Sequence, residues 1–161
     1  MDLAEITERL NAEYGTSRVI WAPGLAGQDI TDYHSDSLAR LTAPGRVLIN
    51  LPNEPDPRDP FHQAALETND ILEAAGLSIE LIPEPVERRV TSDDFVASCA
   101  NYYVCNGGVV ASQFGDAETD AIACDAQSRH YPGREIVMLN ADALGELGVG
   151  IHCATQQEPA V

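Results

Sequence analysis

The chain has 161 residues, of which 44% are hydrophobic and 22% are charged, and this composition suits one globular domain with a buried core. Its formal net charge of −17 argues against nucleic acid or an anionic membrane as partner, because both require positive surface. That charge would attract a small cationic substrate, or simply keep the protein soluble. No apolar run approaches the roughly 20 residues of a membrane helix, and the acidic N-terminus lacks a signal-peptide pattern, so we expect a cytoplasmic protein.

The N-terminal region predicts a helix followed by a short strand. Residues 3–15, LAEITERLNAEYG, place apolar side chains at helical spacing and end on Gly15. Residues 18–22, RVIWA, indicate a strand because they are apolar and rich in β-branched and aromatic side chains. Residues 24–41 then mix loop residues with an alternating polar stretch, to which we assign no strand.

Two similar strand–helix–strand units follow. In the first, the apolar run RVLIN (residues 46–50) predicts a buried strand, a helix covers residues 59–76, and residues 77–83 form a second strand. The second unit holds two short strands about an NGG turn, a helix begun by Asp116, a strand and a short helix, over residues 101–115, 116–130, 131–139 and 141–147. This weak repeat predicts an α/β fold of similar modules in one undivided domain.

The densest polar cluster is TDYHSD, residues 31–36. In an extended segment, Asp32, His34 and Asp36 would share one side, because side chains alternate with a period of two. That face could bind a metal ion, or place an acid/base histidine beside a carboxylate that grips a cation. Asp32 or Ser35 could instead cap the following helix, which is the more common use of such residues.

Four cysteines lie without zinc-site spacing, and we expect them to be reduced thiols: Cys99, Cys105, Cys124 and Cys153. Cys153 follows His152, and neighbours in an extended segment face opposite ways, so we expect His152 to be poorly placed as its base. Of the other histidines, His34 lies in the polar cluster, whereas His62 and His130 belong to predicted helices. Taken alone, Cys153 could be a nucleophile, a metal ligand or a small buried side chain.

Five longer motifs run along nearly the whole chain: WAPGLAGQDITDYHSD (21–36), ARLTAPGRVLI (39–49), FVASCANYYVCNGGVVASQFGD (95–116), YPGREIV (131–137) and GIHCATQQEPA (150–160). In this order they resemble agmatine deiminase and the related Porphyromonas-type peptidylarginine deiminases. The resemblance covers the C-terminal half of the family's sequence. We therefore expect residues 1–161 to be the C-terminal portion of such a domain, with the N-terminal half absent.

The resemblance implies a pseudo-fivefold α/β propeller, the fold of guanidine-modifying enzymes, to which this chain would supply the last two or three modules. It also implies hydrolysis of a guanidinium group. Agmatine would give N-carbamoylputrescine and ammonia, a step of putrescine biosynthesis, without a metal or other cofactor. Cys153 matches the family's nucleophile and His34 its acid/base histidine. Asp36 matches a carboxylate that binds the guanidinium, and we place Asp32 beside it as a second substrate ligand.

Two positions depart from the family pattern. Resembling sequences usually have glycine where Tyr33 stands, which suggests a positive φ there, and the loop before the nucleophile is usually richer in glycine than ELGVGIHC, where Val149 intervenes. The alternatives are a catalytically incomplete fragment that acts only by association, or a deiminase of peptidylarginine or free arginine. As a partner we expect another copy of the chain or the absent N-terminal half.

Overall fold

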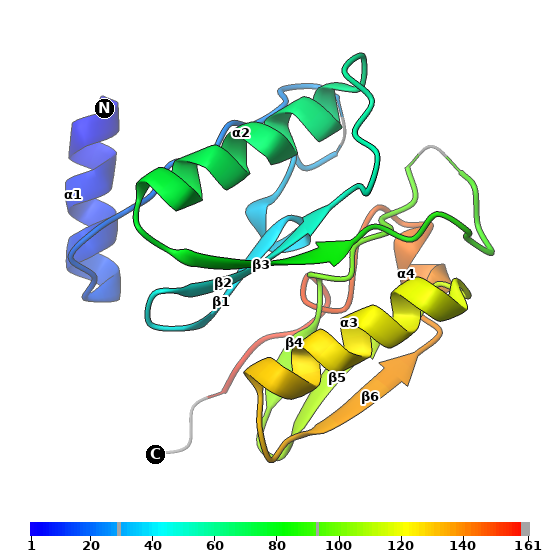
Figure 1. Cartoon of the computed structure of the whole chain (residues 1–161). Helices are drawn as coiled ribbons and strands as arrows, with labels where there is room; N and C mark the ends of the chain where they lie inside the picture. Colours follow the sequence, from blue (N-terminus) through cyan, green and yellow to red (C-terminus); the bar gives the residue numbers. More distant parts are fainter. Residues whose placement is uncertain (29, 93, 159–161) are drawn as a thin grey trace.

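The chain folds into two successive units, each a three-stranded sheet with one long helix, preceded by a separate helix (Figure 1). The computed structural model describes residues 1–28, 30–92 and 94–158. The first part holds α1 (Leu3–Tyr14), the 3-10 turn η1 (Ser35–Ser37), β1 (Ala39–Ala43), β2 (Arg46–Leu51), α2 (Pro60–Ala74) and β3 (Ser78–Pro83). The second part holds β4 (Tyr103–Cys105), β5 (Gly108–Ser112), α3 (Ala117–His130), β6 (Glu135–Leu139) and α4 (Asp142–Gly145).

The two units have the same topology, which confirms the repeat read from the sequence. Their strand orders are β1-β2-β3 and β4-β5-β6. In each, the first pair is antiparallel, and the second pair is parallel and joined by the long helix. A helical crossover is the usual connection between neighbouring parallel strands.

Helix α3 lies between the two sheets, whereas α2 covers the outer face of the first sheet (Figure 1). One core cluster joins Leu48 and Ile82 of the first sheet to Val109 of the second and Ala123 of α3. A second cluster packs Ile49 of β2 against α2. Because β2 is buried on both faces, its sequence is a continuous apolar run rather than an alternating one.

The helix boundaries follow the predicted signals. Asp59 accepts a hydrogen bond from the Phe61 N–H (2.8 Å) ahead of α2, and Asp116 accepts one from the Thr119 N–H (3.1 Å) ahead of α3. Gly15 ends α1 with a φ of 63°, a left-handed conformation that glycine adopts without strain. None of the described helices has the length and apolar character needed to cross a bilayer.

Two expectations about strands are wrong. Residues 18–22 form no strand, because they pair with no other strand in the described part of the chain. Arg18 instead donates to the Ala75 carbonyl (2.9 Å), and Trp21 donates to Thr7 of α1 (3.0 Å). Conversely, the predicted loop over residues 24–41 runs into β1, whose strand character comes from pairing with β2 rather than from its own composition.

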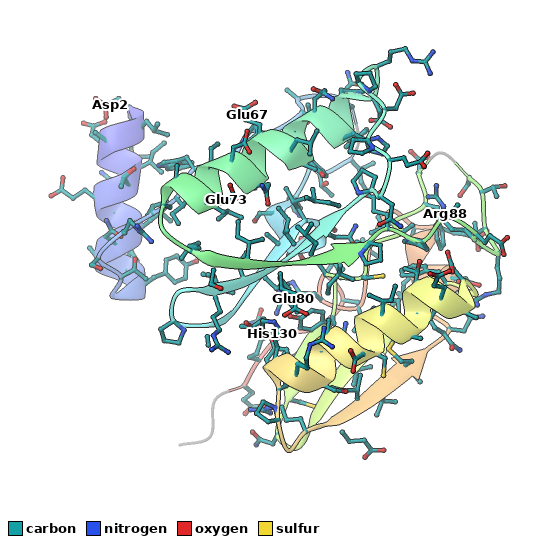
Figure 2. All side chains as sticks on the ribbon, viewed as in Figure 1. Asp2, Glu67, Glu73, Glu80, Arg88 and His130 are labelled. Atoms are coloured by element: carbon teal, nitrogen blue, oxygen red, sulfur yellow. The ribbon has the colours of Figure 1, made fainter. Side chains whose placement is uncertain are left out.

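A polar bridge joins the two units beside α3. Figure 2 shows Glu80 of β3 facing His130 at the end of α3; the glutamate oxygen and His130 Nε2 are 2.9 Å apart. His130 Nδ1 contacts Thr42 Oγ1 (2.6 Å), and Arg129 also bonds to Glu80. The hydrogen bond from Arg129 holds the pKa of Glu80 below its usual value. His130, which the sequence placed only in a predicted helix, is therefore part of the contact between the units.

Candidate active site

A pocket of about 310 Å³ lies beyond the carboxyl ends of β2 and β3 and is lined by both Cys153 and His34. Parallel strands place their following loops at this edge of a sheet, where ligands of α/β folds commonly bind. Because β1 is antiparallel to β2, the segment before β1 reaches the same edge and carries His34 there. The structure thus brings together two predicted site residues that are far apart in sequence.

Cys153 lies in a tight turn and is exposed to solvent. The Ala154 N–H donates to the Gly150 carbonyl (3.2 Å), and the Thr155 N–H donates to the His152 carbonyl (3.1 Å). The extended geometry expected for His152 and Cys153 is therefore wrong, and these neighbours do not face opposite ways. Both side chains instead contact one carboxylate, that of Asp36.

Asp36 lies in η1 with its Oδ2 atom 2.6 Å from His152 Nδ1 and 3.4 Å from Cys153 Sγ. Its Oδ1 atom is buried, and among the described residues it has no hydrogen-bond partner. Burial acts to raise the pKa of Asp36, but the hydrogen bonds from His152 and Cys153 outweigh it and hold that pKa below the usual value. The result is an ionised carboxylate beside the sulfur.

The shared face expected for Asp32, His34 and Asp36 does not form, because the segment is not extended. Asp32 and Tyr33 have positive φ values of 54° and 69°, and η1 follows directly. Asp32 Oδ1 accepts a hydrogen bond from the Gly27 N–H (2.6 Å), which closes the loop instead of facing the pocket. The predicted helix cap is also wrong, since no side chain caps η1.

Acidic side chains dominate the charged part of the pocket wall. Glu84, Asp59 and Asp94 line it together with one arginine, Arg88. Glu84 lies 3.8 Å from His62 Nε2, yet burial raises the pKa of its carboxyl despite the nearby His62 and Arg88. His62, which the sequence placed only as a helix residue, thus belongs to the pocket, with Nδ1 accepting from the Asp56 N–H (2.9 Å).

The other cysteines are free thiols, as predicted, and they are not among the residues that line this pocket. Cys99 is buried in the core, and burial raises its pKa to about 12. Within the described residues, no three His, Cys, Asp or Glu side chains are grouped so that they could hold a metal ion.

Comparisons with known proteins identify the family of the chain. Residues 1–159 match the family described as Porphyromonas-type peptidyl-arginine deiminase. The chain belongs to this family. It is 35% identical to a putative agmatine deiminase of Streptomyces coelicolor over 96% of this chain and 48% of that protein. It is 31% identical to the agmatine deiminase of Medicago truncatula over 98% of this chain and 49% of that protein. The chain thus spans about half the length of the family members it matches.

Solved structures of the family show the same mixed α/β fold. The agmatine deiminase of Enterococcus faecalis matches 99% of this chain with 48% of its own, at a TM-score of 0.82 and 26% identity. A C. jejuni agmatine deiminase with substrate bound matches 97% of this chain with 46% of its own, at a TM-score of 0.83 and 21% identity. The predicted α/β fold and the predicted family are therefore confirmed.

Proposed function

We propose that this chain is the part of an agmatine deiminase that carries the nucleophile, and that it comprises the C-terminal two or three modules of a pseudo-fivefold α/β propeller. The observation that carries the activity is that Cys153 and His34 line one pocket while Asp36 contacts the Cys153 sulfur, in a chain of this family. A carboxylate can grip the planar N–H fork of a guanidinium, and Asp36 would thereby hold its carbon near Cys153 Sγ.

The chemistry proceeds in two substitutions at the guanidinium carbon. The Cys153 thiolate attacks that carbon and forms a C–S bond. The C–N bond then breaks, and ammonia leaves with a proton from His34. His34, now neutral, takes a proton from water as the water attacks the same carbon. The C–S bond breaks and the remaining hydroxyl proton is lost to solvent, which returns the thiolate and releases the urea product, N-carbamoylputrescine.

The charges on the pocket wall favour agmatine over arginine. Agmatine carries a second cation at its far end, whereas free arginine carries a carboxylate there. Glu84, Asp59 and Asp94 supply three acidic groups against the single Arg88 among the charged lining residues that the structure describes. A second amine would be attracted to this wall and a carboxylate repelled.

The described residues by themselves provide few carboxylates to bind the guanidinium. Asp36 is the described carboxylate that contacts Cys153, and Asp32 is turned into its own loop. We propose that further carboxylates come from other modules, carried by a second copy of the chain. Exposed apolar side chains are consistent with such a pairing: Leu41, Leu81, Val86, Leu139 and Leu147.

Selective labelling of Cys153 tests the guanidinium grip without requiring turnover. Chloroacetamidine carries a cationic amidinium, whereas chloroacetamide is its neutral counterpart. We expect Cys153 to react preferentially with the cation, and Asp36→Asn to reduce that preference about tenfold, because a hydrogen bond between charged groups contributes about 1.5–3 kcal/mol. The rates are measured by mass spectrometry of the peptide cut after Arg134, which spans residues 135–161 and contains Cys153 alone among the cysteines.

Asp32→Asn is the matched control, since it removes the same charge at a nearby carboxylate that bonds within its own loop and does not line the pocket. Asparagine tolerates a positive φ and can still accept from the Gly27 N–H. We expect this variant to keep the wild-type preference for the cation. Equal loss in both variants would mean that general acidity, and not Asp36, attracts the probe.

A further inference from the structure

We propose that Asn101 is a positioning residue that stabilises the thiolate form of Cys153 and fixes the direction of its sulfur into the pocket. This inference rests on the proposed role of Cys153 as nucleophile. Asn101 is only 2% exposed and lies in the loop just before β4, on the second unit. Its Nδ2 atom donates to Cys153 Sγ at 3.2 Å, which brings a fixed N–H dipole to the sulfur.

The orientation of the Asn101 amide is determined by its other contacts. Oδ1 accepts a hydrogen bond from the His152 N–H at 2.8 Å, and Nδ2 also donates to Ser37 Oγ at 3.1 Å. A reversed amide would turn its NH₂ group against the His152 N–H, leaving two donors face to face. The backbone next to the nucleophile therefore forces the donor side of Asn101 toward the sulfur.

Gly150 makes this approach possible. A Cβ atom at residue 150 would lie 2.2 Å from Asn101 Oδ1, well inside van der Waals contact, and Asn101 is buried and cannot move aside freely. The glycine is thus required by the packing of Asn101 against the turn that carries Cys153. Both ends of Asn101 are fixed in this way, by the turn on one side and by η1 through Ser37 on the other.

The N–H of Asn101 opposes the effect of Asp36 on the sulfur. Asp36 Oδ2, 3.4 Å from Sγ, is an acceptor that favours the protonated thiol, whereas Asn101 is a donor that favours the thiolate. A cation bound at Asp36 would neutralise the carboxylate that favours the thiol, and the Asn101 donor that favours the thiolate would remain. Asn101 would then stabilise the thiolate at the moment when the guanidinium is in place.

The pH profile of iodoacetamide alkylation at Cys153 tests this role, again through the 135–161 peptide. We expect Asn101→Ala to lower the alkylation rate at pH 7 about tenfold and to move the half-maximal rate to higher pH, because a hydrogen bond to a charged group is lost. Asn101→Asp should move it further, since it places a negative charge at the same position. Asn106→Asp, in the exposed turn between β4 and β5, makes the same charge change away from the site and should leave the profile unchanged.

Folding is monitored by circular dichroism, and two variants keep the test decisive if Asn101→Ala unfolds. Asn101→Asp preserves the shape and the acceptor for the His152 N–H. Gly150→Ala leaves residue 101 intact but displaces it, so it should shift the profile in the same direction as Asn101→Ala. Profiles that superimpose on that of the wild type in folded variants would overturn the proposal. Because alkylation needs no substrate, absence of agmatine hydrolysis would refute the proposed function and leave this test unaffected.

Discussion

Replacing His34 with asparagine should lower the rate of ammonia release from agmatine by about 10²- to 10⁴-fold, the usual contribution of a positioned acid/base group. Asparagine can hydrogen-bond but can neither protonate the leaving ammonia nor accept a proton from the attacking water. The rate is measured by coupled ammonia detection at saturating agmatine. His34 is exposed and lines the pocket, so we expect its replacement to leave the fold intact.

Alkylation provides the internal control for this variant. Chloride leaves chloroacetamidine without a proton, so labelling of Cys153 in His34→Asn should remain within a few-fold of wild type while hydrolysis collapses. If labelling falls as far as hydrolysis does, His34 would act on the state of the sulfur rather than on the leaving group. A hydrolysis rate unchanged from wild type would remove His34 from the mechanism.

Replacing Tyr102 with alanine should lower the free energy of unfolding by about 3–5 kcal/mol, as for other large buried aromatic side chains. Tyr102 is fully buried and packs edge-on against Tyr131, with the ring centroids 5.8 Å apart. The guanidinium of Arg40 lies 5.0 Å from the Tyr102 ring centroid. Because Arg40 belongs to the first sheet and Tyr131 follows α3, a cavity here would loosen the junction of the two units. Urea unfolding followed by circular dichroism measures the loss.

Tyr102→Phe separates packing from hydrogen bonding at the same position. It removes only the contact between the Tyr102 and Tyr131 hydroxyl oxygens, which are 3.0 Å apart, and should lower the free energy of unfolding by about 1 kcal/mol. A phenylalanine variant as unstable as the alanine variant would show that the hydroxyl pair, not the ring, stabilises this junction.

Local signals in the sequence were sufficient to predict most of the secondary structure. β2 is indicated by its own apolar run, and the starts of α2 and α3 are indicated by the aspartates that cap them. Both signals depend only on residues close in sequence, so they can be read from the sequence alone. β1 could not be predicted in this way, because its residues have weak strand propensity and it exists by pairing with β2. The strand predicted over residues 18–22 is wrong for the opposite reason. These residues have high strand propensity, but they pair with no described strand.

Residues of the candidate site could be predicted where they belong to a sequence motif. They could not be predicted where their position depends on the backbone conformation. Cys153, His34 and Asp36 could be proposed from their motifs. The structure lines one pocket with Cys153 and His34, and it places Asp36 Oδ2 3.4 Å from Cys153 Sγ. The prediction for Asp32 was wrong because Asp32 and Tyr33, two consecutive residues other than glycine, have positive φ values. An alternating pattern of polar residues does not indicate such a conformation. Asn101 and Glu84 were missed because each reaches the site through contacts between residues far apart in sequence, such as the 52-residue separation of Asn101 from Cys153.

Tyr33 shows how a departure from the family pattern can be accommodated. Its φ of 69° shows that Tyr33 takes the left-handed conformation that we expected at this position. For a bulky residue this conformation costs about 1–3 kcal/mol. The Tyr33 ring recovers part of that energy by packing edge-on against Phe61, with a centroid separation of 5.2 Å. Both rings line the pocket, so this substitution also gives the wall an aromatic surface.

The central claim is that Cys153 hydrolyses a guanidinium group, and ammonia release from agmatine by the purified 161-residue chain, beside its Cys153→Ala variant, tests it most directly. The account predicts ammonia and N-carbamoylputrescine in equal amounts from the wild-type chain and neither product from the variant, since Cys153 is the one cysteine among the described residues that line the pocket. Ammonia released at the same rate by the variant, or none released by the wild-type chain, would contradict it.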